Sequence, residues 1–321
     1  MARLPRLSEL TSDDAGVGFF LCTMKEVRPT KVGGEFLDLR LQDASGQVVG
    51  RVFDDVARYG AQFEAGDFVR VEGRGQTFNG QLQLKVSSIR RVHPEQDRRE
   101  GFREEDCVLS APRPIGEMWS ELEARVAAVS HPSLRVLLRR VLDEQGSALR
   151  EWPAAQVIHH AYRGGFLEHL CTMAAAAADL GRLYGADTDL LLAGVVLHDI
   201  GKLQELSYDR GLVSYTRDGN LLGHITQGVL LVRAMAAQIP DFPDEVRVHL
   251  EHLILSHHGS KEHGSPVEPK TVEAFILAAV DDLDARLNQV RRAIAEDAGE
   301  GEFTGWHKKL NRVFYKGPAA G

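Results

Sequence analysis

The chain has 321 residues, 43% of them hydrophobic, and a net charge of −8; its length exceeds one average domain and predicts two domains with ordinary apolar cores. No apolar run reaches the roughly 20 residues of a membrane helix, the first residues lack the apolar segment of a secretory signal, and three cysteines are too few for a disulfide framework, so we expect a cytoplasmic protein with no membrane partner. The first hundred residues carry 15 basic and 15 acidic residues, so the acidic excess lies in the later part and argues against nucleic-acid binding through bulk charge alone.

Residues 17–91 show the short alternating segments of a sheet with one solvent-facing side. Five strands are predicted, at Phe19–Val27, Glu35–Asp43, Gln47–Phe53, Asp67–Arg74 and Gln81–Ile89. Asn79-Gly80 is a type I′ hairpin signal, and residues 54–64 have room for a short helix between the third and fourth strands. This arrangement predicts a small all-β Greek-key barrel of the OB-fold type over residues 1–95.

Basic and aromatic residues on these strands are candidates for binding a single nucleic-acid strand, because OB-folds combine a positive groove with aromatic rings on which bases stack. The wider set of candidates is Phe36, Arg40, Arg51, Phe53, Arg70, Arg74, Phe78 and Lys85. From it we select Arg40, Arg74, Phe78 and Lys85; Arg74 and Phe78 flank the predicted hairpin between strands four and five. As alternatives, Phe36 and Phe53 could belong to the barrel core, and exposed basic side chains could serve only solubility.

Residues 96–116 are dense in charge and proline and show no sustained period, which predicts a linker. Helical spacing dominates afterwards, and the expected helices are Trp119–Val126, Pro132–Asp143, Phe166–Tyr184, Asp189–His198, Leu221–Gln238, Asp244–Ser256 and Lys270–Ala295. No interval looks like a strand pair, so residues 117–300 are predicted to form an all-α helical bundle. Residues 301–321 form a tail that interleaves basic and aromatic residues, and either contact with RNA or packing on a neighbouring subunit would explain it.

An apolar run that begins at Leu191 ends abruptly in His198 and Asp199, with Lys202 shortly after. Such a run predicts a helix that is buried on most sides, so the imidazole and the carboxylate would lie inside the domain. Burying both groups is costly unless a cation compensates, and a metal ion is the usual compensation. His198 and Asp199 are therefore candidate metal ligands.

Further histidine and aspartate residues lie within or at the edge of other helix-like segments, namely His169, His224, His257, His258 and Asp281. Helices spaced in this way can aim one side chain each at a common centre. Imidazoles and carboxylates without thiolates favour a first-row divalent ion such as Mn, Fe, Zn or Ni, although Mg²⁺ stays possible. Asp282 and Asp284 are expected to face elsewhere than Asp281, because adjacent helical residues diverge by about 100°; either could still orient a ligand.

These residues resemble a known signature. The pattern His169, His198-Asp199 and Asp281 resembles that of the HD phosphohydrolase superfamily, and His224 with His257-His258 is similar to its two-metal members. Three longer segments resemble the YhaM-type 3′ to 5′ exoribonucleases, which place an OB-fold ahead of an HD domain: His159–His169, Leu197–Leu206 and Tyr215–His224. The resemblance covers nearly the whole chain.

The resemblance implies a metal-dependent exonuclease that hydrolyses single-stranded RNA, with single-stranded DNA as a further substrate, to nucleoside 5′-monophosphates. It implies one ion on His169, His198, Asp199 and Asp281, and a second on Asp199, His224 and His257. Two divalent ions are expected, Mn²⁺ foremost, with Mg²⁺, Fe²⁺, Ni²⁺ or Zn²⁺ as alternatives.

Individual roles follow from the same resemblance. Asp199 would be the bridging, catalytic carboxylate. Lys202 would neutralise a phosphate oxygen, although a lysine after a glycine is often only a charge at a helix C-terminus. His258 would orient a metal ligand, be a ligand itself or contact the phosphate. His159 and His160 would line the pocket and contact a ligand side chain or the phosphate. A homo-oligomer is a further expectation.

Two other functions stay open at this stage. HD sites also serve phosphohydrolases of nucleotides or cyclic nucleotides, although an OB-fold is superfluous for a small substrate. A non-catalytic adaptor that binds single strands is the other alternative. The complete set of ligand-type residues argues against it, because a dead site has no reason to keep buried charges.

Overall fold

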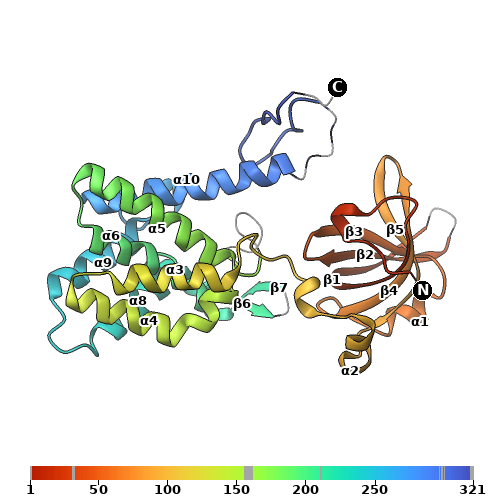
Figure 1. Cartoon of the computed structure of the whole chain (residues 1–321), viewed down its shortest axis with the longest axis horizontal. Helices are drawn as coiled ribbons and strands as arrows, with labels where there is room; N and C mark the ends of the chain where they lie inside the picture. The colour runs from red at the N-terminus through yellow and green to blue at the C-terminus, as the bar shows by residue number, and fades with distance from the viewer. Residues whose placement is uncertain are drawn as a thin grey trace. The chain divides into compact units, whose positions relative to one another are not determined.

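A computed structural model describes the chain except for residues 1, 31–32, 155–161, 210–211, 296, 298, 300 and 319–321. The chain divides into two compact units (Figure 1). The first consists of Met1–Ser110 with Tyr208–Val213, and the second of Ala111–Ser207 with Ser214–Gly321. No helix in the described ranges combines the length and the apolar character that crossing a membrane requires.

The first unit contains a closed five-stranded barrel, as predicted. Its strands are β1 Ala15–Pro29, β2 Glu35–Asp43, β3 Gly46–Val52, β4 Phe68–Phe78 and β5 Gln81–Arg91. Their order is β1-β2-β3-β5-β4, β4 pairs with β1 to close the barrel, and only the β3–β5 pair among these is parallel. The short helix α1, Val56–Gly60, lies between β3 and β4. This topology confirms the OB-fold.

The alternation in the sequence explains how the barrel forms. Leu37, Leu39 and Leu41 point inward and are fully buried, whereas Arg40 between them is exposed. The β4–β5 connection is the predicted tight turn, since Asn79-Gly80 has φ values of 51° and 75°, and a type I′ turn needs a positive φ at both central residues.

The segment after the barrel also packs onto it. It contains the helix α2, Pro94–Asp97, and 3₁₀ turns at Arg98–Glu100 and Glu104–Asp106. The Phe102 ring lies 5.5 Å from that of Phe19 and 5.6 Å from that of Phe68. The predicted linker therefore contains folded structure up to Ser110, which its irregular sequence did not reveal. The exact domain boundaries stay a prediction.

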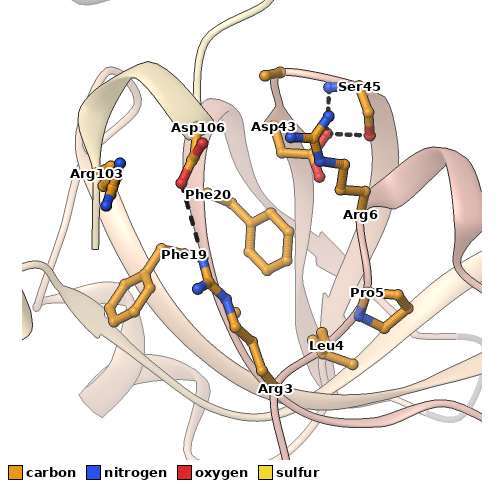
Figure 2. A pocket seen from close by; sticks show the side chains of 12 residues that line it. Arg3, Leu4, Pro5, Arg6, Phe19, Phe20, Asp43, Ser45, Arg103 and Asp106 are labelled. Carbon is orange, nitrogen blue, oxygen red and sulfur yellow. Dashed lines mark hydrogen bonds and ion pairs between the residues drawn. The ribbon is translucent and has the colours of Figure 1, made fainter. Parts of the chain in front are cut away.

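The N-terminal segment runs along the barrel beside the last of these turns, with a short 3₁₀ helix at Leu7–Glu9 (Figure 2). Arg3 Nη2 lies 3.9 Å from Asp106 Oδ2, and the Leu7 N–H donates to Asp43 Oδ2 at 2.8 Å. The two segments that flank the barrel line one cavity of about 260 Å³. These contacts fix both flanking segments to the barrel.

The second unit is a helical bundle. Its helices are α3 Ile115–Ala127, α4 Pro132–Glu151, α5 Gly165–Tyr184, α6 Thr188–Leu197, α7 Lys202–Glu205, α8 Arg217–Ala236, α9 Asp244–Ser256 and α10 Val272–Ala295, with a 3₁₀ turn at Lys261–His263. They surround an apolar core in which α6 is buried on most sides. The helical bundle that the sequence predicted is confirmed.

One expectation for this region was wrong. Two short strands, β6 Leu206–Asp209 and β7 Leu212–Tyr215, pair with each other between α7 and α8. Four residues are too few for the alternation of polar and apolar residues to stand out, so this strand pair could not be predicted from the pattern.

Candidate metal centre

The end of α6 brings the first polar pair into the core. The Asp187 carboxylate caps the start of α6 by accepting from the N–H groups of Asp189 and Leu190, and the helix then consists of buried apolar residues up to Leu197. His198 and Asp199 follow with exposed fractions of 0% and 2%. Both side chains are therefore withdrawn from water, as the apolar run predicted.

Two further helices complete a first cluster. His169 on α5 and Asp281 on α10 meet His198 so that one ligand-type atom from each lies within 4.8 Å of the others. Asp281 Oδ1 lies 3.3 Å from His169 Nε2 and 3.9 Å from His198 Nε2. We call His169, His198 and Asp281 the first cluster.

A second cluster forms from α8 and the end of α9. His224, His257 and His258 also place one ring nitrogen each within 4.8 Å of the others. A Cβ at Gly201 would lie 2.0 Å from the His224 carbonyl oxygen, so the absence of a side chain at Gly201 lets α8 approach the turn that carries Asp199. Gly223, with a φ of 69°, kinks α8 directly before His224.

Asp199 lies between the two clusters. Its Oδ2 atom is 3.3 Å from His198 Nε2 in the first cluster. Its Oδ1 atom is 3.4 Å from His224 Nε2 and 3.5 Å from His257 Nε2 in the second. One carboxylate therefore presents one oxygen to each cluster, which is the geometry of a bridging ligand.

Every imidazole in the two clusters is fixed through its Nδ1 atom. The Nδ1 partners are Asp284 Oδ2 for His169 at 2.6 Å, Val195 O for His198 at 2.8 Å, Glu205 Oε1 for His224 at 3.1 Å, Ile254 O for His257 at 2.7 Å and His263 O for His258 at 3.0 Å. All five partners are acceptors, so each Nδ1 carries a proton, as inferred from the partners. The Nε2 atoms of His169, His198, His224 and His257 thereby face the carboxylates of Asp281 and Asp199.

The residues fit a divalent metal. Among the residues that the structure describes, no hydrogen-bond partner is present for Asp199 Oδ1 or for the Nε2 atoms of His198, His224 and His257, although these atoms are buried. Leaving several polar atoms buried in this way is costly unless a ligand satisfies them. Imidazole Nε2 and carboxylate oxygen are the donors that first-row divalent ions use, and acceptors behind each imidazole are typical of metal-ligating histidines.

Lys202 supplies positive charge at the same place. Its Nζ atom lies 2.5 Å from Asp199 Oδ2. Burial alone would raise the pKa of Asp199, but Lys202 and His198 outweigh it and hold that pKa well below the ordinary range. Burial likewise opposes a charged Lys202, and the Asp199 carboxylate raises its pKa nevertheless. Asp199 is therefore an anion and Lys202 a cation at neutral pH.

Two carboxylates hold imidazoles: Asp284, which the sequence analysis left open as a residue that orients a ligand, and Glu205, which it missed. Asp284 faces His169, contrary to our expectation that it would face away; it follows Asp281 by three residues, and residues three apart lie on one side of a helix. Glu205 accepts from the backbone N–H of His224 at 3.0 Å besides facing its ring. No local pattern linked Glu205 to a histidine 19 residues later. His159 and His160 lie outside the described residues.

The selected residues of the barrel share its outer surface. Strand pairing places Lys85 opposite both Arg51 and Arg74, and all four selected residues, Arg40, Arg74, Phe78 and Lys85, are exposed. The Arg51 guanidinium carbon lies 5.6 Å from the ring centroids of Phe36 and of Phe78. The Phe36 and Phe53 rings stack at 5.5 Å, outside the barrel core.

Arg70, a member of the wider set of candidates, is paired within the chain, since it donates to Glu100 at 3.0 Å.

Comparison with known proteins agrees with both units. Residues 166–286 match the family model of the HD domain, and residues 23–92 match that of an OB-fold nucleic acid binding domain. The second OB-fold domain of replication protein A from Methanococcus maripaludis is similar to part of the chain, at 22% identity and a TM-score of 0.25, over 29% of this chain and 96% of that chain.

Curated relatives extend the likeness across both units. The chain is 38% identical over 292 residues to the 3′-5′ exoribonuclease YhaM of Bacillus licheniformis, which covers 88% of this chain and 89% of that protein. It is 36% identical over 286 residues to the protein of the same name in Bacillus subtilis, with the same coverage of both chains. The chain therefore belongs to the YhaM family of 3′-5′ exoribonucleases.

Proposed function

We propose that this chain is a metal-dependent nuclease that removes nucleotides from the 3′ end of single-stranded RNA and releases nucleoside 5′-monophosphates. The observation that carries the proposal is the position of Asp199, which directs one oxygen to each of two histidine clusters. The names of the relatives in Bacillus licheniformis and Bacillus subtilis support the reaction and its direction.

Two divalent ions are part of the proposal, Mn²⁺ foremost, with Mg²⁺, Fe²⁺, Ni²⁺ and Zn²⁺ as alternatives. One ion would be held by His169, His198, Asp199 and Asp281, and the other by Asp199, His224 and His257. Bound there, such ions supply activation of water and neutralisation of phosphate oxygens. His258 belongs to the second cluster by position, which supports it as an additional ligand or a phosphate contact.

The remaining residues would position the substrate. Lys202, held against Asp199, would balance charge on a non-bridging phosphate oxygen. The exposed rings and cations of the barrel, with Arg51 against Phe78, support binding of a single strand through stacking and phosphate contacts. A preference for RNA over DNA, self-association and a cytoplasmic location stay predictions.

Substitution of Asp199 tests this function. We expect Asp199→Ala to abolish release of mononucleotides, a loss well beyond the about 100-fold that changes behind the ligands cause, because both ions lose a shared ligand. The measurement is the product length of end-labelled RNA and DNA oligomers with Mn²⁺, Mg²⁺ or chelator. Asp282→Asn, at an exposed aspartate of α10, is the matched control.

Trimming by Asp199→Ala at the rate of the unmodified chain would refute the site. Release of phosphate from free nucleotides, without trimming of oligomers by the unmodified chain, would instead favour a small-molecule phosphohydrolase. Binding of strands without any hydrolysis in any of the metals would favour the adaptor.

A further inference from the structure

The segment after α10 is a folded hairpin that displays aromatic rings. Phe303 pairs with Tyr315 and His307 with Arg312 as antiparallel bridges, and Figure 1 shows this segment at the C-terminal end of α10. Trp306 is 62% exposed and Phe303 and Tyr315 are each more than half exposed. Large aromatic side chains are normally withdrawn from water, so three displayed on one short hairpin call for a partner.

Polar contacts hold the hairpin in this shape. Thr304 is buried, and its N–H donates to the carbonyl oxygen of Phe314 at 2.8 Å. Lys316 Nζ donates to Asp297 Oδ1 at 2.6 Å, and Gly305 N–H donates to Asp297 Oδ2 at 2.8 Å. The exposed rings are therefore attached to a backbone that hydrogen bonds and an ion pair hold in place, so little conformational freedom is lost when the rings bind a partner.

The charge of the hairpin identifies the partner. Residues 303–318 contain four lysines or arginines and no acidic residue, in a chain whose net charge is −8. Lys308, Lys309 and Arg312 are exposed and form no ion pair with any residue in the described ranges. Cations beside exposed rings suit a polyanion that also carries flat aromatic groups, which is the chemistry of a single nucleic-acid strand.

The distance from the metal centre defines which part of a strand would reach the hairpin. Asp281 of the first cluster and Ala295 at the end of α10 are 14 residues apart on one helix, which corresponds to about 21 Å. Stacked nucleotides advance about 3.4 Å each, so a dinucleotide in the metal centre cannot reach the hairpin. A longer strand can.

We propose that the hairpin of residues 303–316 is a second binding site for single-stranded RNA, separate from the barrel, which takes the strand on the 5′ side of the nucleotide being removed. Trp306 stacks on a base, and Lys308, Lys309 and Arg312 contact phosphates. The inference rests on the proposed exonuclease function and adds to it a site that retains long substrates.

Trp306→Ala in the full chain tests the stacking. We expect kcat/KM for a 20-nucleotide RNA to fall about fivefold or more, the effect of losing one base stack, while hydrolysis of a dinucleotide stays unchanged. Tyr184→Ala is the matched control, since Tyr184 is 66% exposed at the end of α5 in the same unit. Equal rates of Trp306→Ala and the unmodified chain on the 20-mer would overturn the inference.

Substitution of the three cations tests the phosphate contacts. We measure how the association constant for the 20-mer changes with salt concentration. The slope of log association constant against log salt is expected to become shallower by about 2 in Lys308→Ala/Lys309→Ala/Arg312→Ala, because each phosphate contact to a single strand contributes about 0.7. Arg139→Ala, at an exposed arginine of α4, should leave the slope unchanged. An unchanged slope in the triple variant would also overturn the inference.

Light scattering on the same proteins tests the alternative that the tail packs on a neighbouring subunit. If Trp306→Ala lowers the number of subunits, and activity on the 20-mer falls only in proportion to that loss, the hairpin is a subunit contact and the inference fails. If the unmodified chain trims no RNA of any length, the proposed function fails first; a chain that trims RNA equally well with and without Trp306 leaves that function intact and refutes only the hairpin site.

Discussion

Asp284 and Glu205 each stand behind a histidine of the metal centre. Asp284 holds the ring of His169 at 2.6 Å, and Glu205 holds that of His224 at 3.1 Å. The other three imidazoles are held by backbone carbonyls, which no substitution can remove. The two carboxylates are therefore the only such partners, among the described residues, whose effect on metal binding can be tested by mutation.

We expect Asp284→Asn and Glu205→Gln each to weaken metal binding about 10- to 100-fold, the usual effect of removing a carboxylate behind a ligating histidine. The charge that stabilises the imidazole is lost, although the shape is kept. Calorimetric titration of each variant with Mn²⁺ measures the affinity. Asp282→Asn should match the unmodified chain, since Asp282 is exposed and pairs with Arg286 at the surface. An affinity for Asp284→Asn equal to that of Asp282→Asn would contradict the assignment.

The two carboxylates beside His169, Asp281 and Asp284, predict a pH dependence of metal binding. Burial lowers the pKa of His169, but Asp281 and Asp284 outweigh it and raise that pKa to about 9, so the metal-free ring is protonated at neutral pH. A metal must displace this proton, and affinity is therefore expected to rise by roughly tenfold per pH unit up to about pH 9. Calorimetry at pH 7.5 in two buffers of different ionisation enthalpy should record proton release; none released would exclude a protonated His169.

Individual residues differ in how far the sequence could reveal them. The apolar run before His198-Asp199 was informative because a buried charge needs compensation, and that argument is local. Asp284 could have been found from its spacing to Asp281, since helical residues three apart are neighbours. Glu205 could not, because its contact with His224 depends on how close α7 and α8 approach.

Whole elements were more predictable than the contacts between them. The core strands and the long helices carry many periodic positions, so β2 and α9 lie where the pattern placed them, at Glu35–Asp43 and Asp244–Ser256. The pair β6–β7 has four residues in each strand, and the segment that packs on the barrel up to Ser110 is held by scattered single residues. Neither produces a period that can be read from the sequence.

The packing of α8 on the turn after α6 depends on Gly201. Its φ of −63° suits any residue, so the requirement is space: a Cβ would lie 2.0 Å from the His224 carbonyl oxygen and 2.6 Å from the Gly228 nitrogen. We expect Gly201→Ala to cost about 1–3 kcal/mol of stability and to separate His224 from Asp199. Denaturant unfolding and Mn²⁺ stoichiometry measure the two effects.

Gly116→Ala is the control for that substitution. A Cβ at Gly116 would have no heavy atom within 4 Å, and the residue lies in the first turn of α3, so alanine there should stabilise the chain by up to about 1 kcal/mol. A Gly201→Ala protein with the stability and metal content of Gly116→Ala would show that close packing of α8 is not needed for the second cluster.

Across the whole molecule, the proposed hydrolytic site lies in the helical unit, whereas the barrel is proposed to contribute strand binding only. The metal centre is built entirely from residues of the helical unit, which has its own apolar core. The barrel has a separate core and carries the half-buried Arg51 against the exposed Phe78. A change on the barrel should therefore affect long strands and leave the hydrolytic step alone.

Arg51→Ala/Phe78→Ala in the full chain tests this division of labour. We expect KM for a 20-nucleotide RNA to rise about fivefold or more, since a stacked base and a phosphate contact are lost, while kcat for a small chromogenic phosphodiester stays the same. Deleting residues 1–110 should have the same effect in stronger form. A cut at residue 95 would instead leave Phe102 without its barrel partners, because its ring packs against Phe19 and Phe68. Equal losses on the long RNA and on the chromogenic substrate would mean that the barrel supports the fold of the metal centre rather than the binding of the strand. A defect in strand binding alone cannot slow the hydrolysis of a substrate that has no strand.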